Sequence, residues 1–442
     1  MKRLINIIQK QIVARMQTIF TKSAVVRGIV IVGIVAIFLG GGAAGYKYYP
    51  YSQIQRAEVA FLGEAYGIIR ENYWQKVSDE DLSNLFSQGI GQVGGKSYQL
   101  KQGEQNERGV RRIAASAMVG MSAEERETFV TTLTHLILQS LPPEGLSALY
   151  APEQREELTQ MVNNVDTQED LYARIGADQN ASLEEIQETY VQKKEEAETP
   201  EELQQLERAL DVLTDEQARA RYNETGAQST VFGRVVSSTT YYLRITRVSP
   251  VTFQEFQKEV KRIPSTGQLH TLILDLRDNI GGSVDILPEF LGPFVGYDSY
   301  AYEFFHKGEK EPFKTTTGWM TELVPFKRVV ILVNENTQSS AEVMVATFQK
   351  YNVGVVVGTQ TRGVGSIKRV FEMENQINPK IPYSIFLVHS LTLRPDGEAI
   401  QGLGVTPTVD MRDPQWKEQL LLRYASEDLA TTVEQVWENP PL

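Results

Sequence analysis

One short segment combines the residue types and spacing that nucleophilic catalysis needs. Residues 336–342 read Asn-Thr-Gln-Ser-Ser-Ala-Glu and lie between an apolar run at 328–334 and a helical pattern that begins near Ser340. A serine on such a turn exposes its hydroxyl at the end of a strand, and the first N–H groups of the helix point at the same place. The segment therefore predicts a nucleophile beside an oxyanion site.

The elements around this turn predict an α/β domain. Apolar runs typical of buried strands alternate with amphipathic helical patterns, which favours a mostly parallel sheet covered by helices. The expected strands are 241–246, 271–276, 328–334 and 353–358, and the expected helices are 253–263 and 340–350. We assign this core to residues 235–412. Residues 413–442 follow it as one C-terminal amphipathic helix.

Two regions before the core are helical in pattern. Residues 53–160 repeat apolar side chains at helical spacing, interrupted by a polar, glycine-rich loop at 93–109, and predict an all-α cap. Residues 167–226 predict a second helical unit, and the acidic residues of its second helix, 200–213, are expected to form a solvated face.

The N-terminal residues predict a membrane anchor. Residues 28–46 are uncharged and mostly apolar, which is long enough for one transmembrane helix. Residues 1–27 carry six basic residues and no acidic one, so this segment should be cytoplasmic and everything after residue 46 extracytoplasmic. The small residues at 41–45 leave a cleaved signal peptide as the alternative.

The composition excludes several classes of function. The net charge is −12 and no basic stripe follows the N-terminus, so nucleic-acid binding is not expected. The chain has no cysteine and only four scattered histidines, so we expect neither disulfides nor a metal site. No motif calls for a cofactor.

Four ordered segments resemble the carboxyl-terminal processing, or tail-specific, serine peptidases. They include Leu-Arg-Asp-Asn-Ile-Gly-Gly, the serine turn, Val-Gly-Thr-Gln-Thr-Arg-Gly and a closing run that ends in Gly-Val-Thr-Pro. The segments are 274–282, 333–342, 357–363 and 397–407. The resemblance implies a ClpP/crotonase-like core, a polypeptide substrate and Ser339 as nucleophile. It also implies an oxyanion site made by Gly281, Gly282 and Ser340.

Each of these roles has a simpler alternative. Ser339 could only cap the helix that follows it, and the two glycines could serve a turn for backbone reasons alone. The family activates its serine with a lysine, but that position holds Val364 here. A related branch uses a histidine, whose position holds Leu146.

Lys368 is the remaining candidate for the base. If 364–370 is a strand, positions 364 and 368 share a face and lie roughly 13 Å apart. A lysine side chain covers about half that gap, so Lys368 would reach Ser339 through a shifted geometry or a water. The alternative is a surface lysine. His135, His270 and His389 are weaker candidates, because no motif places them at the serine.

Residues 167–226 resemble the J-domain of DnaJ-like co-chaperones at both ends, through the segments 170–177 and 210–222. The family's His-Pro-Asp element is absent, because the corresponding loop reads Ala-Glu-Thr-Pro at 197–200. A module that binds a partner is therefore expected rather than an active co-chaperone. The module occupies the interval where the tail-specific peptidases carry a PDZ domain.

Two functions follow from these expectations. In the first, a membrane-anchored serine peptidase cleaves extracytoplasmic polypeptides with Ser339. In the second, an inactive pseudoprotease binds a polypeptide or membrane partner through the same cleft and the J-like module.

Overall fold

The computed structural model describes residues 56–265 and 267–441 of the chain. The predicted cytoplasmic segment 1–27 and membrane span 28–46 lie outside these residues. Among the helices of the described ranges, none has the length and apolar character that a bilayer crossing requires.

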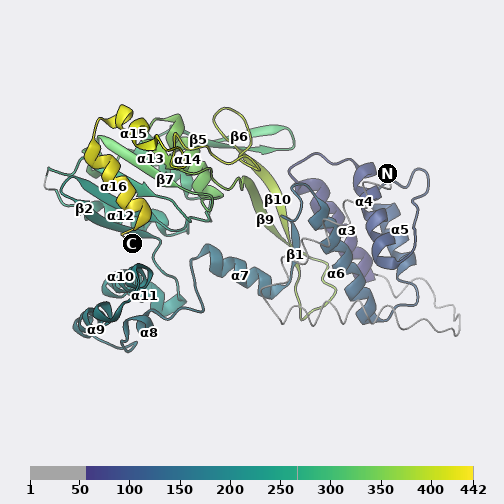
Figure 1. The fold of residues 1–442 in the computed structure, drawn as a ribbon. Coiled ribbons are helices and arrows are strands. Elements are labelled where there is room, and N and C mark those ends of the chain that lie inside the picture. The colour runs from purple at the N-terminus through teal and green to yellow at the C-terminus, as the bar shows by residue number, and fades with distance from the viewer. Residues whose placement is uncertain (1–55, 266, 442) are drawn as a thin grey trace. The chain divides into compact units, whose positions relative to one another are not determined.

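A six-stranded sheet forms the centre of the predicted core (Figure 1). Its order is β11-β8-β7-β4-β3-β2, and every neighbouring pair is parallel except β3 with β2. The strands are β2 (Val231–Ser237), β3 (Thr240–Ile245), β4 (Thr271–Asp275), β7 (Arg328–Val333), β8 (Val355–Gly358) and β11 (Val409–Asp410). The expectation of a mostly parallel sheet is therefore confirmed for this part of the core.

Helices cover both faces of this sheet. Apolar side chains of α12 (Thr252–Lys261), α13 (Leu287–Val295) and α14 (Ser340–Lys350) share one buried cluster with the strands. On the other face lie α15 (Trp416–Tyr424) and α16 (Glu427–Glu438). The single C-terminal helix expected at 413–442 was wrong, because Ala425 adopts a left-handed backbone (φ 48°) that ends α15. The hydroxyl of Ser426 then caps α16.

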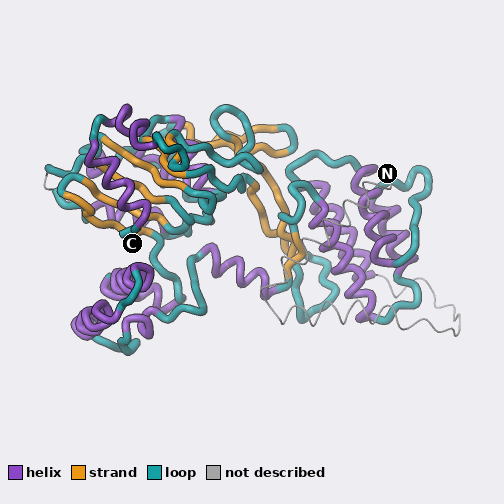
Figure 2. Tube along the Cα trace, in the orientation of Figure 1, coloured by secondary structure: helices purple, strands orange, loops and turns teal. Residues whose placement is uncertain are grey.

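A second, antiparallel sheet stands beside the first and was not predicted (Figure 2). Its longest strand, β10 (Ser384–Leu393), pairs with β9 (Ser366–Glu372) along one edge and with β1 and β5 along the other. The remaining strands are β1 (Ala148–Tyr150), β5 (Tyr300–His306) and β6 (Glu309–Lys314). The strand expected at 364–370 is thus shifted to Ser366–Glu372.

Residues 56–162 form the expected helical cap with one exception. The helices are α3 (Arg56–Asn72), α4 (Asp79–Gly94), α5 (Glu107–Ala117), α6 (Ala123–Ser140) and α7 (Pro152–Val162). The cap is not all-α, because β1 pairs with β10. Its apolar core also includes Met373, Ile385 and Leu387 of the antiparallel sheet and the loop beside it. The cap and this sheet therefore share one hydrophobic core.

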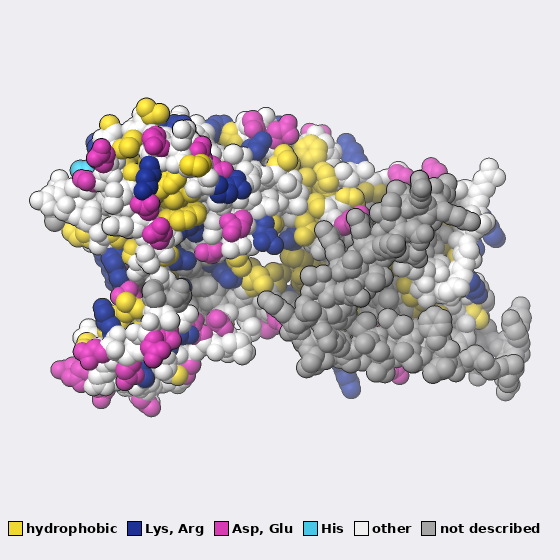
Figure 3. Space-filling view, in the orientation of Figure 1, with side chains coloured by type: hydrophobic (Ala, Val, Ile, Leu, Met, Phe, Trp, Pro, Cys, Tyr) yellow, Lys and Arg dark blue, Asp and Glu magenta, His cyan; other side chains and the backbone are white. Residues whose placement is uncertain are grey.

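Residues 167–226 form a helical module with two long helices between two shorter ones. They are α8 (Leu171–Ile175), α9 (Leu183–Glu196), α10 (Pro200–Thr214) and α11 (Glu216–Thr225). Acidic side chains gather on the surface of this module (Figure 3). On α10, Glu202 is exposed as the solvated-face prediction requires, but the prediction was wrong for Glu207, which is buried and pairs with Arg234 at 2.8 Å. The element order suits the J-domain resemblance, which stays a prediction.

A buried ion pair fixes the loop that follows β4. The side chain of Asp275 is fully buried and accepts hydrogen bonds from Arg277 and from the hydroxyl of Tyr242 at 2.7 Å. The guanidinium of Arg277 also donates to the carbonyls of Val436 and Trp437 at the end of α16. Because a cation is favourable at the C-terminus of a helix, this arrangement joins α16 to the start of loop 276–282.

Candidate active site

Ser339 occupies the strand-to-helix turn that the sequence predicted. It is the N-cap of α14, with φ 59° and ψ −129°, a conformation that costs free energy for any residue other than glycine. The residue is partly exposed, and its hydroxyl forms no hydrogen bond with any described residue. This strained, partly exposed residue follows the carboxyl end of β7.

Loop 276–282 and the serine turn are joined by hydrogen bonds. The hydroxyl of Thr337 donates to the carbonyl of Leu276 at 2.8 Å, and the N–H of Gln338 donates to the carbonyl of Asn279 at 2.9 Å. The side chain of Asn279 is fully buried and donates to the carbonyl of Ile245. These bonds place the two glycines beside the serine.

Only glycine fits at positions 281 and 282. A Cβ on Gly281 would lie 2.6 Å from Cβ of Ser339, and a Cβ on Gly282 would lie 2.2 Å from the carbonyl oxygen of Val248. Both residues also have positive φ angles, 80° and 142°. The close approach to Ser339 favours a site role for this turn over a purely local backbone role.

The three predicted oxyanion donors are not equivalent. The N–H of Gly281 donates to Oδ1 of Asn279 at 2.8 Å, so it is unavailable to a bound carbonyl in this structure. Within the described residues, neither the N–H of Gly282 nor that of Ser340 has an acceptor. Gly282 and Ser340 thus carry the two N–H groups near Ser339 that have no described acceptor.

Glu342 is the central residue of the site, and its role was missed from the sequence. Its fully buried carboxylate accepts from the N–H groups of Ser339, Gly363 and Val364 at 2.8–2.9 Å and from the hydroxyl of Thr361 at 2.5 Å. Burial raises its pKa, while these four donors oppose the shift. The Ser-Ser-Ala-Glu order, with glutamate at the third helical position, is the signal that could have found it.

Val364 lies close to Ser339. One oxygen of Glu342, Oε2, accepts from the N–H of Ser339 and from the N–H of Val364. The two backbone positions are therefore neighbours, which is where a base would be useful. The valine side chain cannot accept a proton.

Lys368 points away from that place. It lies on β9 opposite Val388, and its Nζ is 5.7 Å from the ring centroid of Phe386, the residue paired with Val370. Val370 lies beyond Lys368 on β9, on the side away from Val364. Burial lowers the pKa of Lys368, and no carboxylate in the described ranges pairs with it. The amine is thus partly desolvated, and it is not bonded to Ser339.

The other candidates for the base are not brought to the serine. His270 precedes β4, at the opposite end of a strand roughly 17 Å long. His135 lies on α6 in the cap, where burial lowers its pKa. Leu146 stands where a related branch of the family has a histidine. It precedes Ser147, whose hydroxyl accepts a hydrogen bond from the N–H of Val388, and Val388 pairs with Lys368. Leu146 therefore lies near the pairing of β9 with β10 at Lys368.

His389 instead stacks on His306, with ring centroids 4.3 Å apart and an interplanar angle of 13°. Burial, together with the nearby charges of Arg369, His306 and Lys307, lowers the pKa of His389 to about 4. An unfolded histidine titrates near ~6.5. The neutral ring therefore contributes stability that is complete above about pH 6.5 and is lost as the pH falls toward 4.

We expect the free energy of unfolding to fall by roughly 1–2 kcal/mol between about pH 7.5 and about pH 5 through this group. His389→Phe keeps a stacked ring that cannot titrate, so urea unfolding of this variant should show a smaller fall. An equal fall in both proteins would contradict the assignment.

Comparison with known proteins gives this geometry a family context. A model described as Peptidase family S41 matches residues 239–411. The carboxy-terminal-processing protease of Bartonella bacilliformis is 28% identical over 181 residues, which cover 39% of this chain and 39% of that protein. The carboxy-terminal processing protease CtpA of Bacillus subtilis is 26% identical over 210 residues, covering 46% of this chain and 43% of that protein.

Among solved structures, a photosystem II D1 C-terminal processing protease superposes with a TM-score of 0.47 at 13% identity. That superposition covers 81% of this chain and 94% of the other. The chain spans about two fifths of the length of the curated relatives it matches. Residues 239–411 thus match peptidase family S41, and carboxy-terminal processing proteases are their relatives.

Proposed function

We propose that this chain is a serine peptidase of the S41 type that acts on polypeptides, with Ser339 as its nucleophile. The observation that carries the proposal is a serine with a strained backbone beside the N–H groups of Gly282 and Ser340, which have no hydrogen-bond acceptor among the described residues. In this mechanism Oγ attacks a peptide carbonyl and loses its proton to a base. The two N–H groups stabilise the oxyanion, and the base then returns the proton to the leaving amine.

Lys368 is our candidate for the base. Its lowered pKa supports a neutral amine, which is the form that accepts a proton. To act, Nζ must leave the ring of Phe386 and turn toward Val364, either to contact Oγ directly or through a water. Catalytic hydrogen bonds often form only when substrate binds, so the present geometry leaves this role open to test.

We place the peptidase domain on the extracytoplasmic side of a membrane, held by residues 28–46. The support is the apolar length of that segment and the one-sided charge before it. The helical module, in the place of a PDZ domain, would then meet extracytoplasmic polypeptides.

Lys368→Met tests the base. We expect hydrolysis of an unstructured polypeptide by the full chain to fall by roughly 10²-fold or more, because methionine keeps the length and loses the amine. Lys380→Met, at an exposed lysine in the loop before β10, is the matched control and should leave the rate unchanged. A rate that survives Lys368→Met would remove this residue from the mechanism.

The second candidate is a pseudoprotease that binds polypeptides without cleaving them. Val364 at the family's lysine position and the unbonded hydroxyl of Ser339 favour it. Under this function the wild-type chain retains an unstructured polypeptide but leaves it intact, and Ser339→Ala changes neither result.

A further inference from the structure

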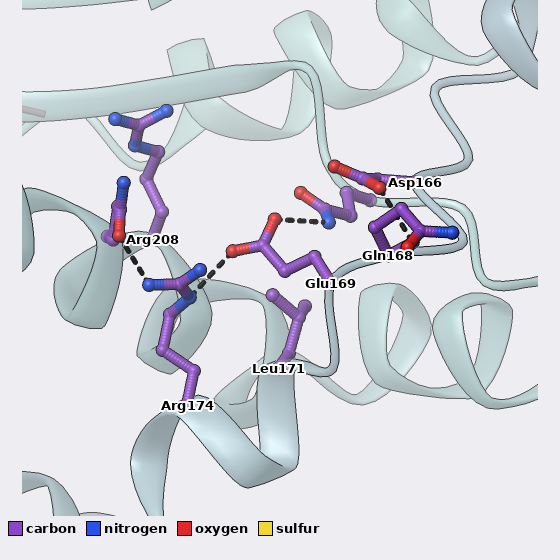
Figure 4. Close-up of a pocket in the computed structure, with 8 residues that line it drawn as sticks. Asp166, Gln168, Glu169, Leu171, Arg174 and Arg208 are labelled. Carbon is purple, nitrogen blue, oxygen red and sulfur yellow. Dashed lines mark hydrogen bonds and ion pairs between the residues drawn. The ribbon is translucent and has the colours of Figure 1, made fainter. Parts of the chain in front are cut away.

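The helical module contains a pocket of about 310 Å³ that the peptidase mechanism does not use. It lies where α8 and α10 meet the two connections by which the chain enters and leaves the module. We call it the Arg208 pocket (Figure 4). Its lining residues are Asp166, Gln168, Glu169, Leu171, Arg174, Gln205, Arg208 and Gln228.

Most charges in the Arg208 pocket already have partners. Arg174 pairs with Glu169 at 2.6 Å and donates to the side-chain oxygen of Gln205. The other oxygen of Glu169 accepts from Nε2 of Gln228 at 2.8 Å. These contacts neutralise Glu169, so this carboxylate is not free to pair with a further cation.

Arg208 has no such partner. In the described ranges no hydrogen bond or ion pair involves its guanidinium, and its Nε is sealed from solvent. A half-buried cation that forms no hydrogen bond or ion pair of its own is costly. Burial lowers the pKa of Arg208, and the nearby charges of Arg244 and Arg174 act in the same direction, while the carboxylate of Glu169, which is already paired with Arg174, opposes the shift. The immediate surroundings of Arg208 therefore favour an added negative charge.

We propose that the Arg208 pocket binds a small oxyanion, a carboxylate or a phosphate, through the guanidinium of Arg208. The planar fork of arginine donors matches both groups in a bidentate way. The amide nitrogen of Gln205 is a second donor, because its oxygen is used by Arg174 and no described acceptor takes its N–H groups. The volume holds a single small anionic group with its carrier.

Binding there would also brace the module. Asn164 and Gln228 lie in the two connections and exchange hydrogen bonds, with Gln228 N–H to Asn164 carbonyl at 3.0 Å and Asn164 Nδ2 to Gln228 carbonyl at 3.1 Å. Gln168 and Gln228 of these two connections line the Arg208 pocket, so a ligand held there by Arg208 and Gln205 would lie against both connections. Bound anion should therefore raise the melting temperature of the chain.

The test uses the full chain with inorganic phosphate and with acetate, each against sodium chloride at matched ionic strength. We expect a saturable rise in melting temperature with at least one of the two anions and none with chloride. The anion that binds more tightly distinguishes a phosphate site from a carboxylate site. Isothermal titration calorimetry of that anion gives its dissociation constant.

Arg208→Gln should weaken this binding by roughly tenfold or more, because it removes a charge-assisted bidentate contact. Arg208→Lys should keep part of the affinity. Arg423→Gln, at an exposed arginine on α15, is the matched control and should bind as wild type does.

Removing an unpaired buried charge should not unfold the chain, so Arg208→Gln stays testable. Two results would overturn the proposal. One is a rise in melting temperature with phosphate and acetate no larger than with chloride. The other is a rise that is the same in Arg208→Gln as in wild type. Ser339→Ala should give the same binding curve as wild type, which separates this inference from the peptidase function.

Discussion

In the Lys368→Met background, which lacks the proposed base, Val364→Lys should raise the rate of polypeptide hydrolysis by roughly 10²-fold or more. General-base catalysis contributes about 10²–10⁴-fold, and position 364 lies beside the nucleophile because one oxygen of Glu342 accepts from both backbone nitrogens. The substitution leaves the N–H of Val364 on Glu342. In the partly buried site, desolvation lowers the pKa of the new amine and favours its neutral form.

Val364→Met is the matched control for this gain. In the same background it has similar length and no amine, so its rate should stay at that of Lys368→Met alone. Adding Ser339→Ala to Val364→Lys should return hydrolysis to background. No gain from Val364→Lys in a folded protein would mean that the serine turn cannot be activated from position 364, and would count against the alignment of this site.

Glu342→Ala should lower the free energy of unfolding by about 3 kcal/mol and remove any hydrolytic activity. The change leaves the N–H groups of Ser339, Gly363 and Val364 and the hydroxyl of Thr361 without their acceptor, and each buried unpaired donor costs about 1–3 kcal/mol. The segment 361–364 then loses its attachment to the serine turn. Urea unfolding measures the first effect and polypeptide hydrolysis the second.

Glu309→Ala removes an exposed carboxylate on β6 and should change stability by no more than about 0.5 kcal/mol. The loss of stability in Glu342→Gln should lie between those of Glu342→Ala and Glu309→Ala. The amide oxygen of glutamine still accepts hydrogen bonds, but its amide nitrogen faces N–H and O–H donors. If Glu342→Ala were as stable as Glu309→Ala, the carboxylate would not hold the two segments together.

The sequence predicted the parallel sheet because its strands are continuous apolar runs, a local signal that survives without tertiary information. The antiparallel sheet was not predicted because β6 and β9 are rich in charged residues and do not read as apolar runs. In addition, β1 and β5 pair with β10 from distant parts of the chain. The break at Ala425 escaped because alanine is a good helix former, and only the packing of α15 and α16 against the sheet forces its left-handed backbone.

The candidate site shows the same limit. Ser339 and the two glycines were found because a strand-to-helix turn and a Gly-Gly pair are visible in the sequence. The engagement of Gly281 by Asn279, and the position of Nζ of Lys368 over Phe386, depend on side-chain directions that spacing alone does not determine. In the sequence Glu342 resembles an ordinary glutamate at the start of a helix. Three of its four hydrogen-bond donors come from residues 361–364, which only the tertiary structure brings to it.

The central claim is that Ser339 is a nucleophile presented beside an oxyanion site. The most direct measurement treats the folded full chain with a fluorophosphonate probe and locates the adduct by mass spectrometry. We expect an adduct on the peptide that contains Ser339 and its loss in Ser339→Ala. A folded wild-type chain that stays unlabelled at this serine would rule out the nucleophile and leave the pseudoprotease function in its place.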